Sequence, residues 1–201
     1  MLTIGLTGNL GTGKTTVSEI LAELGAILIN ADKLGHELFQ PDNPTYHEVV
    51  AAFGEKILTP DKEIDRQKLS QLVFVDTAAL TQLNQIMHPK MYEIAQKRIE
   101  RYRDQGAKVV VLEAALLIEA DWISLVDEIW VTTAPEAAIV KRLTSQRGLS
   151  EKQILERLHS QMPSEEKTKQ ANVVINTDCT INELKAKMTE LWQKLQTEQK
   201  I

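Results

Sequence analysis

The 201-residue sequence has one cysteine, few aromatic residues and no excess of positive charge. Because Cys179 has no partner for an intramolecular disulfide, we expect a small buried thiol in a reduced compartment. The formal net charge of −5 argues against a protein that coats nucleic acid, since that role needs clustered Lys and Arg. A small anionic ligand held by a few local cations remains open.

Long apolar runs and metal-binding patterns are also missing. No segment approaches the roughly 18 apolar residues of a membrane span, and the first residues are typical of a strand rather than of a signal peptide. We therefore expect a soluble cytoplasmic protein without a membrane partner. The four histidines show no zinc spacing, and no G-x-S-x-G elbow indicates a hydrolase triad.

One segment near the start carries a clear chemical pattern. Residues 8–15 read Gly-Asn-Leu-Gly-Thr-Gly-Lys-Thr, which fits G-x-x-x-x-G-K-S/T, between an apolar run and an amphipathic segment. Glycines let backbone N–H groups approach a polyphosphate, and the start of the following helix favours the same anion. Lys14 adds a positive charge for the phosphates, and the Thr15 hydroxyl is suited to Mg²⁺.

The alternative is a glycine-rich turn that only joins a strand to a helix. The Lys14-Thr15 pair serves no turn geometry, and the flanking strand and helix patterns are those of a phosphate-binding loop. The sequence therefore predicts a nucleoside triphosphate site.

Apolar runs that alternate with helical periodicity predict a parallel sheet covered by helices. The five expected strands cover residues 2–7, 26–29, 108–112, 128–132 and 173–175. Chain length allows one well-buried core with one inserted subdomain. The expected helix ends include Gly25 after the first helix, Pro135 in the first turn of another, and Ser150 as an N-cap.

Between residues 33 and 106 no core strand is expected. We expect short helices separated by Pro and Gly signals, among them His88-Pro89, and then a long helix from about Pro89 to Gln105. Such an insertion is too long for an ordinary crossover, so it is a candidate substrate-binding subdomain.

Acidic residues follow two of the strands, where ligands gather in open α/β sheets. Asp32 could accept a proton from a substrate hydroxyl during phosphoryl transfer, or it could cap the next helix; position alone does not decide. Glu113 could help to hold Mg²⁺ through water, or it could be a solvated strand end.

Three arginines, Arg142, Arg147 and Arg157, lie in the helical stretch before the last strand. On a closing segment they could neutralise charge on a transferred phosphoryl group. The alternative is that they are solvated helix residues, as most arginines are.

Taken together, these features resemble the dephospho-coenzyme A kinase family over nearly the whole chain. The resemblance is carried by a series of motifs: Gly5-Leu6-Thr7-Gly8 running into Gly11–Thr16; Asn30-Ala31-Asp32 with His36 shortly after; Phe53-Gly54; Ile64-Asp65-Arg66; Leu83-Asn84 leading to His88-Pro89; Leu116-Leu117-Ile118-Glu119; and Arg157 to Gln161.

The resemblance implies a three-layer α/β P-loop kinase fold with a five-stranded parallel sheet. It divides the chain into a nucleotide-binding core (1–32, 107–140 and 170–201), a helical coenzyme-binding insertion (33–106) and a lid (141–169). The implied substrates are ATP, with Mg²⁺, and dephospho-coenzyme A, which is phosphorylated on its ribose 3′-hydroxyl. No nucleic-acid partner is implied, and the sequence indicates no oligomeric state.

The resemblance also assigns roles to residues. Asp32 becomes the expected base, with Lys14 and Arg147 as the other catalytic residues. Nucleotide binding is assigned to Gly11, Thr12, Gly13, Lys14, Thr15, Thr16, Arg142 and Arg147, and the metal to Thr15.

Six positions depart from the family pattern. Asn9 replaces a usual Gly, Asn30 the first Asp of Asp-Ala-Asp, and Ala115 a usual Pro. Around the last strand, Asn172 and Asn176 replace two usual Asp residues, and Thr177 stands in place of a final Asn. Two other functions remain as alternatives: a kinase for a nucleoside monophosphate or another small alcohol, and a nucleotide-dependent switch that binds a partner protein.

Overall fold

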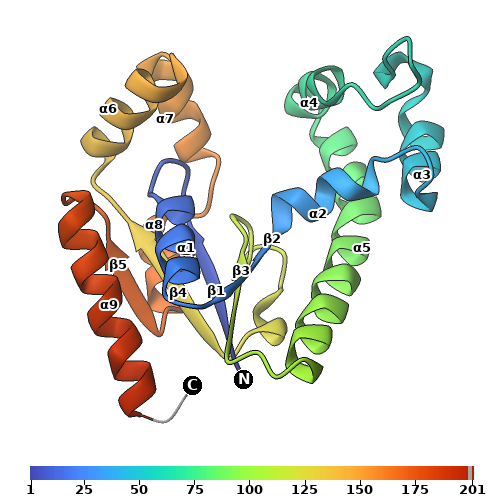
Figure 1. The fold of residues 1–201 in the computed structure, drawn as a ribbon. Helices are drawn as coiled ribbons and strands as arrows, with labels where there is room; N and C mark the ends of the chain where they lie inside the picture. The colour runs from blue at the N-terminus through green and yellow to red at the C-terminus, as the bar shows by residue number, and fades with distance from the viewer. Residues whose placement is uncertain (199–200) are drawn as a thin grey trace. The chain divides into compact units, whose positions relative to one another are not determined.

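The computed structural model describes residues 1–198 and 201, without the side chains of Phe74 and Arg147. The chain divides into two compact units, of which the first contains residues 1–29 and 98–201 and the second residues 30–97. Figure 1 labels their helices and strands.

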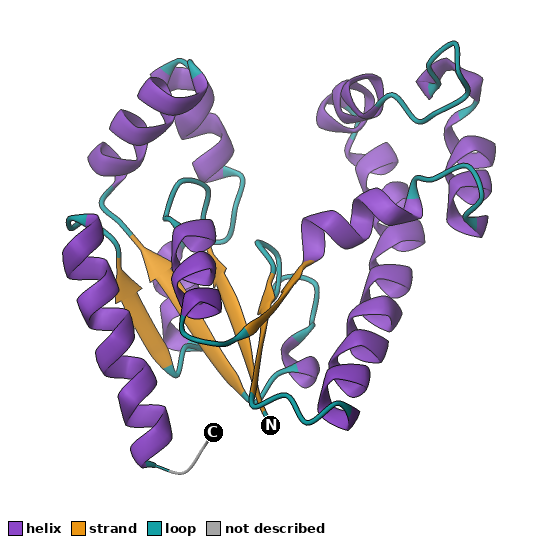
Figure 2. Ribbon diagram, viewed as in Figure 1, coloured by secondary structure: helices purple, strands orange, loops and turns teal. Residues whose placement is uncertain are grey.

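The first unit is built on a five-stranded sheet in the order β2-β3-β1-β4-β5 (Figure 2). The strands are β1 (Leu2–Gly8), β2 (Ile27–Asn30), β3 (Val109–Glu113), β4 (Glu128–Thr133) and β5 (Val173–Asn176). Parallel ladders join β1 to β3, β1 to β4 and β4 to β5. The predicted α/β fold with its five strands is confirmed, with strand boundaries that differ by at most one residue.

Two helices, α1 (Lys14–Glu23) and α9 (Ile181–Thr197), pack on one face of this sheet (Figure 1). Their apolar rows enter one cluster with the strands, which includes Ile4, Leu21, Trp130 and Met188. Gly25 follows α1 with a φ of 112°, as expected for a residue after a helix end. On the other face, Leu117 and Val126 lie against Gly5.

The segment between β4 and β5 is helical. It contains α6 (Glu136–Arg147), α7 (Glu151–His159) and α8 (Ser164–Lys169). Ser150 caps α7 in a capping box with Gln153, as predicted. Pro135 lies one position earlier than expected, because it is the N-cap of α6 rather than part of its first turn.

The second unit has its own apolar core. Its elements are α2 (Ala31–Leu38), α3 (Pro44–Phe53), η1 (Glu55–Ile57), α4 (Arg66–Val75) and most of α5 (Thr77–Asp104). Val49, Ile57 and Leu69 are among its buried residues. A short 3-10 element, η2 (Ile123–Leu125), belongs to the first unit.

The expected break at His88-Pro89 is wrong, since α5 runs through Pro89 without interruption. A proline inside a helix removes one hydrogen bond and costs about 3 kcal/mol. Met87 and Met91, on either side of Pro89, both pack on the apolar core of the second unit. Burial of these flanking side chains offsets the missing bond, and the helix continues.

Candidate active site

The predicted phosphate loop lies between the end of β1 and the start of α1. Gly11 and Gly13 have φ values of 75° and 82°, which residues other than glycine rarely adopt. A Cβ atom at Gly11 would also lie 2.7 Å from the Ile139 side chain. Because Gly13 is the N-cap of α1 and has no side chain, the N–H groups of the first turn face a site that suits an anion.

Lys14, the first residue of α1, folds back over this loop. Its Nζ atom donates to the carbonyl oxygens of Gly8 at 2.7 Å and Asn9 at 3.1 Å. The loop backbone therefore fixes the position of the ammonium group, as expected for a lysine that serves a phosphate group.

Thr15 lies beside a buried carboxylate. Its hydroxyl donates to Glu113 Oε1 at 3.0 Å, and the Ser18 hydroxyl donates to Glu113 Oε2 at 2.8 Å. Glu113 is the last residue of β3 and is only 8% exposed. The alternative of a solvated strand-end glutamate is therefore wrong. The group offers only oxygen donors, which Mg²⁺ prefers.

Arg142 reaches the phosphate loop from α6. Its Nη1 atom donates to the Gly11 carbonyl at 3.4 Å and to the Thr177 hydroxyl at 3.0 Å, and its Nη2 atom donates to the Thr177 carbonyl. The Thr177 hydroxyl also lies 2.9 Å from the Thr12 carbonyl oxygen, to which it can donate. Arg142 is thus held at the loop rather than solvated.

The other two arginines differ from Arg142. Arg147 is the last residue of α6, and its side chain lies outside the described part of the structure. Arg157 is exposed on α7. Of the predicted nucleotide-binding residues, the structure brings Gly11–Thr16 and Arg142 together.

Asp32 belongs to the second unit, in the first turn of α2. The N-cap of this helix is Asn30, whose side chain accepts a hydrogen bond from the Lys33 N–H. The capping role considered for Asp32 is therefore filled by the residue that departs from the family pattern. Asp32 itself is exposed.

Two further departures also have local explanations. Asn9 does not adopt a positive φ, so its backbone makes no demand for glycine. Ala115 accepts hydrogen bonds from Lys167 Nζ and the Thr7 hydroxyl through its carbonyl oxygen, which a proline would also provide. Both substitutions are compatible with the observed loops.

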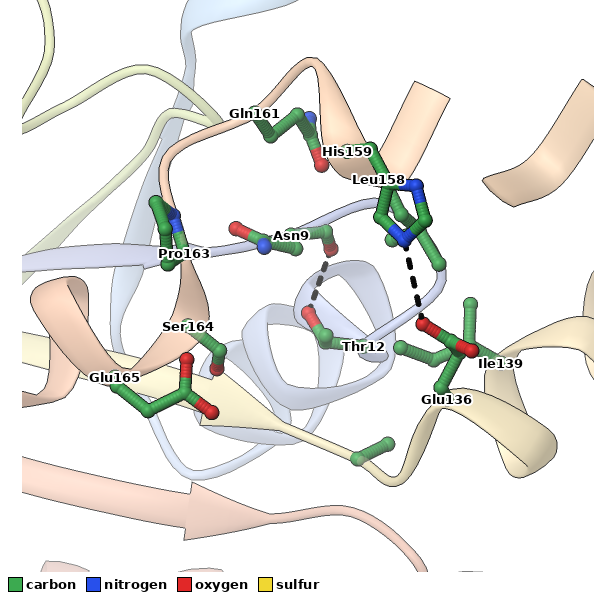
Figure 3. A pocket seen from close by; sticks show the side chains of 11 residues that line it. Asn9, Thr12, Glu136, Ile139, Leu158, His159, Gln161, Pro163, Ser164 and Glu165 are labelled. Atoms are coloured by element: carbon green, nitrogen blue, oxygen red, sulfur yellow. Dashed lines mark hydrogen bonds and ion pairs between the residues drawn. The ribbon is translucent and has the colours of Figure 1, made fainter. Parts of the chain in front are cut away.

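A cavity of about 390 Å³ adjoins the phosphate loop (Figure 3). Asn9 and Thr12 line it from the loop, and α6, the end of α7 and the start of α8 close the other sides. Glu136 and His159 approach each other at its wall, with His159 Nε2 3.8 Å from Glu136 Oε2.

The family model for dephospho-CoA kinase matches residues 2–183. The chain belongs to the dephospho-CoA kinase family. The resemblance seen in the sequence is confirmed, and with it the assignment to the kinases. Among the described residues, no helix is long and apolar enough to cross a membrane.

Curated members of the dephospho-CoA kinase family match nearly the whole chain. The chain is 43% identical to the dephospho-CoA kinase of Geobacter sulfurreducens over 191 residues, which covers 95% of this chain and 97% of that protein. It is 41% identical to the dephospho-CoA kinase of Dehalococcoides mccartyi, covering 92% and 93% of the two chains.

Solved structures of similar fold agree with this family assignment. A Thermus thermophilus protein has a TM-score of 0.82 at 29% identity, covering 96% of this chain and 97% of its own. Dephospho-CoA kinase from Campylobacter jejuni has a TM-score of 0.73 at 25% identity, covering 98% of both chains. A shikimate kinase from Bacteroides thetaiotaomicron, with a TM-score of 0.54 and 16% identity, covers 96% of this chain and 98% of its own and shares the fold.

Reasoning from the sequence assigned no role at the loop to three polar residues that lie around it. Ser18 shares Glu113 with Thr15, Thr177 links Arg142 to the loop, and Gln161 accepts from the Leu10 N–H. Ser18 lies one helical turn after Thr15, a spacing that could have indicated it. Gln161 ends the Arg157-to-Gln161 motif of the family resemblance, but Gln161 and Thr177 lie more than 140 residues from the loop in sequence, so spacing did not predict their contacts with it.

Proposed function

We propose that the protein transfers the γ-phosphoryl group of ATP to the ribose 3′-hydroxyl of dephospho-coenzyme A, which yields coenzyme A and ADP. The observation that carries this proposal is the phosphate loop, with Lys14 held over it and Thr15 beside Glu113, in a chain of the dephospho-CoA kinase family. This reaction is the last step of coenzyme A synthesis.

In this proposal, the ATP phosphates bind the backbone N–H groups of residues 11–16 and the start of α1. Lys14 balances charge on the β- and γ-phosphates. Arg142, already held at Gly11, adds a second cation at the loop. Arg147 is proposed as a further phosphate contact from the lid, residues 141–169.

Mg²⁺ fits the oxygen donors at Thr15, Ser18 and Glu113. Thr15 would bind the ion directly, and Glu113 would hold it through water. Bound there, the ion would supply positive charge that offsets the negative charge built up during transfer. Mg²⁺ sites of this kind use few protein ligands, which suits the finding that no cluster of three His, Cys, Asp or Glu occurs among the described residues.

Asp32 is the proposed base. As the 3′-oxygen attacks the γ-phosphorus, the hydroxyl proton passes to the Asp32 carboxylate, while ADP leaves with the β–γ bridging oxygen. Because Asn30 caps α2, the Asp32 carboxylate is not needed to cap the helix. The helical insertion, residues 33–106, is proposed to hold the rest of the coenzyme precursor.

Closure of the lid would exclude water from the phosphates, which limits wasteful hydrolysis of ATP. A cytoplasmic location remains a prediction from the sequence.

The direct test is to incubate the purified protein with ATP, Mg²⁺ and dephospho-coenzyme A and to follow the products by mass. We expect one phosphoryl group to be added and the product to co-elute with authentic coenzyme A. Parallel reactions should contain a nucleoside monophosphate or shikimate as acceptor. Preferred transfer to either of these, or ATP hydrolysis without any acceptor product, would reject the proposal.

A further inference from the structure

The connection between α7 and α8, residues 160–163, bonds to the phosphate loop at two adjacent residues. The Leu10 N–H donates to Gln161 Oε1 at 2.8 Å, and Asn9 Nδ2 donates to the Met162 carbonyl at 3.1 Å. Figure 3 shows Gln161 and Pro163 on the part of this connection that lies next to Asn9.

The Asn9–Leu10 peptide group has hydrogen bonds on both of its sides. Its N–H donates to Gln161, and its carbonyl oxygen accepts from Lys14 Nζ at 3.1 Å and from the Thr12 hydroxyl at 2.7 Å. Because a peptide group is planar and rigid, its N–H and C=O cannot turn independently. An acceptor that fixes the N–H therefore also fixes the oxygen that receives the lysine.

Asn9 also bonds to the connection between α7 and α8, and its side chain leaves one polar atom without a hydrogen bond in the described part of the chain. Its Oδ1 atom is buried and has no hydrogen-bond partner among the described residues, a state that proteins usually avoid. Its Nδ2 atom nevertheless makes the bond to Met162. A glycine, usual at this position in the family pattern, could not make that bond.

We propose that Gln161 is a positioning residue for Lys14, because it fixes the Asn9–Leu10 peptide group to which the lysine bonds. Through this bond, the end of α7 and the phosphate loop hold one another in place. This inference rests on the proposed function only in taking Lys14 as a ligand of the ATP phosphates.

The test is Gln161→Met, which keeps the length of the side chain but removes the acceptor oxygen. We expect the dissociation constant for ATP, measured with a fluorescent ATP analogue and by calorimetry, to rise about tenfold, the usual weight of one well-placed hydrogen bond to a functional group. The KM for ATP should rise with it, while the KM for dephospho-coenzyme A stays unchanged. Gln161→Glu, which retains an acceptor oxygen, should bind ATP more tightly than Gln161→Met.

The matched control is Gln153→Met, in the first turn of α7, the helix that precedes this connection. Gln153 belongs to the capping box of α7 and has no bond to the loop among those described. We expect it to lower the melting temperature and to leave ATP binding unchanged. If Gln161→Met behaves in the same way, or changes nothing, the positioning role is rejected.

A double-mutant cycle tests whether Gln161 affects ATP binding through Lys14. In a Lys14→Met background, Gln161→Met should change the ATP dissociation constant by less than about twofold, because the group that it positions is gone. An undiminished tenfold effect in that background would contradict the inference. These binding measurements need no acceptor, so they remain decisive even if the wild-type protein fails to phosphorylate dephospho-coenzyme A.

Discussion

The phosphate loop of the first unit and the helical core of the second are held together by different forces. Around the loop, polar bonds come from distant parts of the chain, such as Thr12 to Thr132, Arg142 to Thr177 and Leu10 to Gln161. The core of the second unit is a cluster of apolar side chains, and its ion pairs, such as Lys62 with Glu55, lie on the surface.

This difference indicates that the contacts in the two units have different roles. Directional hydrogen bonds fix atoms to fractions of an ångström, which a site that stabilises charge on a phosphoryl group requires. Apolar packing is non-directional and stabilises a shape rather than one atom position. We therefore expect single polar changes at the loop to abolish chemistry without unfolding, and apolar changes in the second unit to act mainly on stability.

Lys14→Ala should have the largest effect. Removal of the ammonium group leaves the β- and γ-phosphates without their nearest cation, so we expect coenzyme A formation to fall below detection. The melting temperature should stay within a few degrees of the wild-type value, because the other loop contacts remain. Lys187→Ala, on the exposed side of α9, serves as the control. Retained turnover in Lys14→Ala would contradict the role given to the loop.

Asp32→Asn should come next, with turnover reduced by about 10²–10⁴-fold, the usual contribution of a general base. ATP binding should be unchanged. The control is Asp76→Asn, since Asp76 accepts from the Ala78 and Ala79 N–H groups as a helix-capping residue of the same unit. Equal activity in the two variants would remove Asp32 from the chemistry.

The sequence predicted the sheet and the loop because both depend on local patterns. Apolar runs specify buried strands wherever they fall, and the glycines with Lys14 and Thr15 specify the loop. The position of Arg142 at Thr177 could not be predicted, because it depends on which segments the completed sheet brings together. Burial of Glu113 excludes a solvated strand-end glutamate, which a strand-end position in the sequence does not reveal, and its role toward Mg²⁺ stays a proposal.

The helix through Pro89 was missed for a different reason. A proline signals a helix end when only the local backbone is considered. In this chain Met87 is buried in the core of the second unit and the partly buried Met91 packs against it, so that tertiary packing outweighs the local preference. Asn30 illustrates the same limit, since its capping role became evident only with the start of α2 defined.

Ile57→Ala tests the expectation that apolar changes in the second unit act mainly on stability. Ile57 is 1% exposed in the core of the second unit, and truncation of a buried isoleucine to alanine costs about 2–5 kcal/mol. We expect a lower midpoint in urea unfolding, but an unchanged dissociation constant for ATP under conditions where the protein is folded. Val75→Ala is the control, because Val75 is 83% exposed. Weakened ATP binding by folded Ile57→Ala would show that the second unit acts on the loop as well.

The smallest effect should be a pH dependence in the second unit. Burial lowers the pKa of His88, which is half-buried in α5, below its ordinary value of 6.5. Since the unfolded chain then binds the proton more tightly, the stabilising contribution is complete above the unfolded pKa and is lost as the pH falls through the folded pKa. Urea midpoints should therefore decrease from pH 7.5 toward pH 5.5, and His88→Gln should weaken that decrease.

ATP binding should not follow the same pH dependence, because His88 belongs to the second unit and not to the phosphate loop. An unaltered pH profile in His88→Gln would show that burial of this imidazole does not govern the acid sensitivity of the second unit.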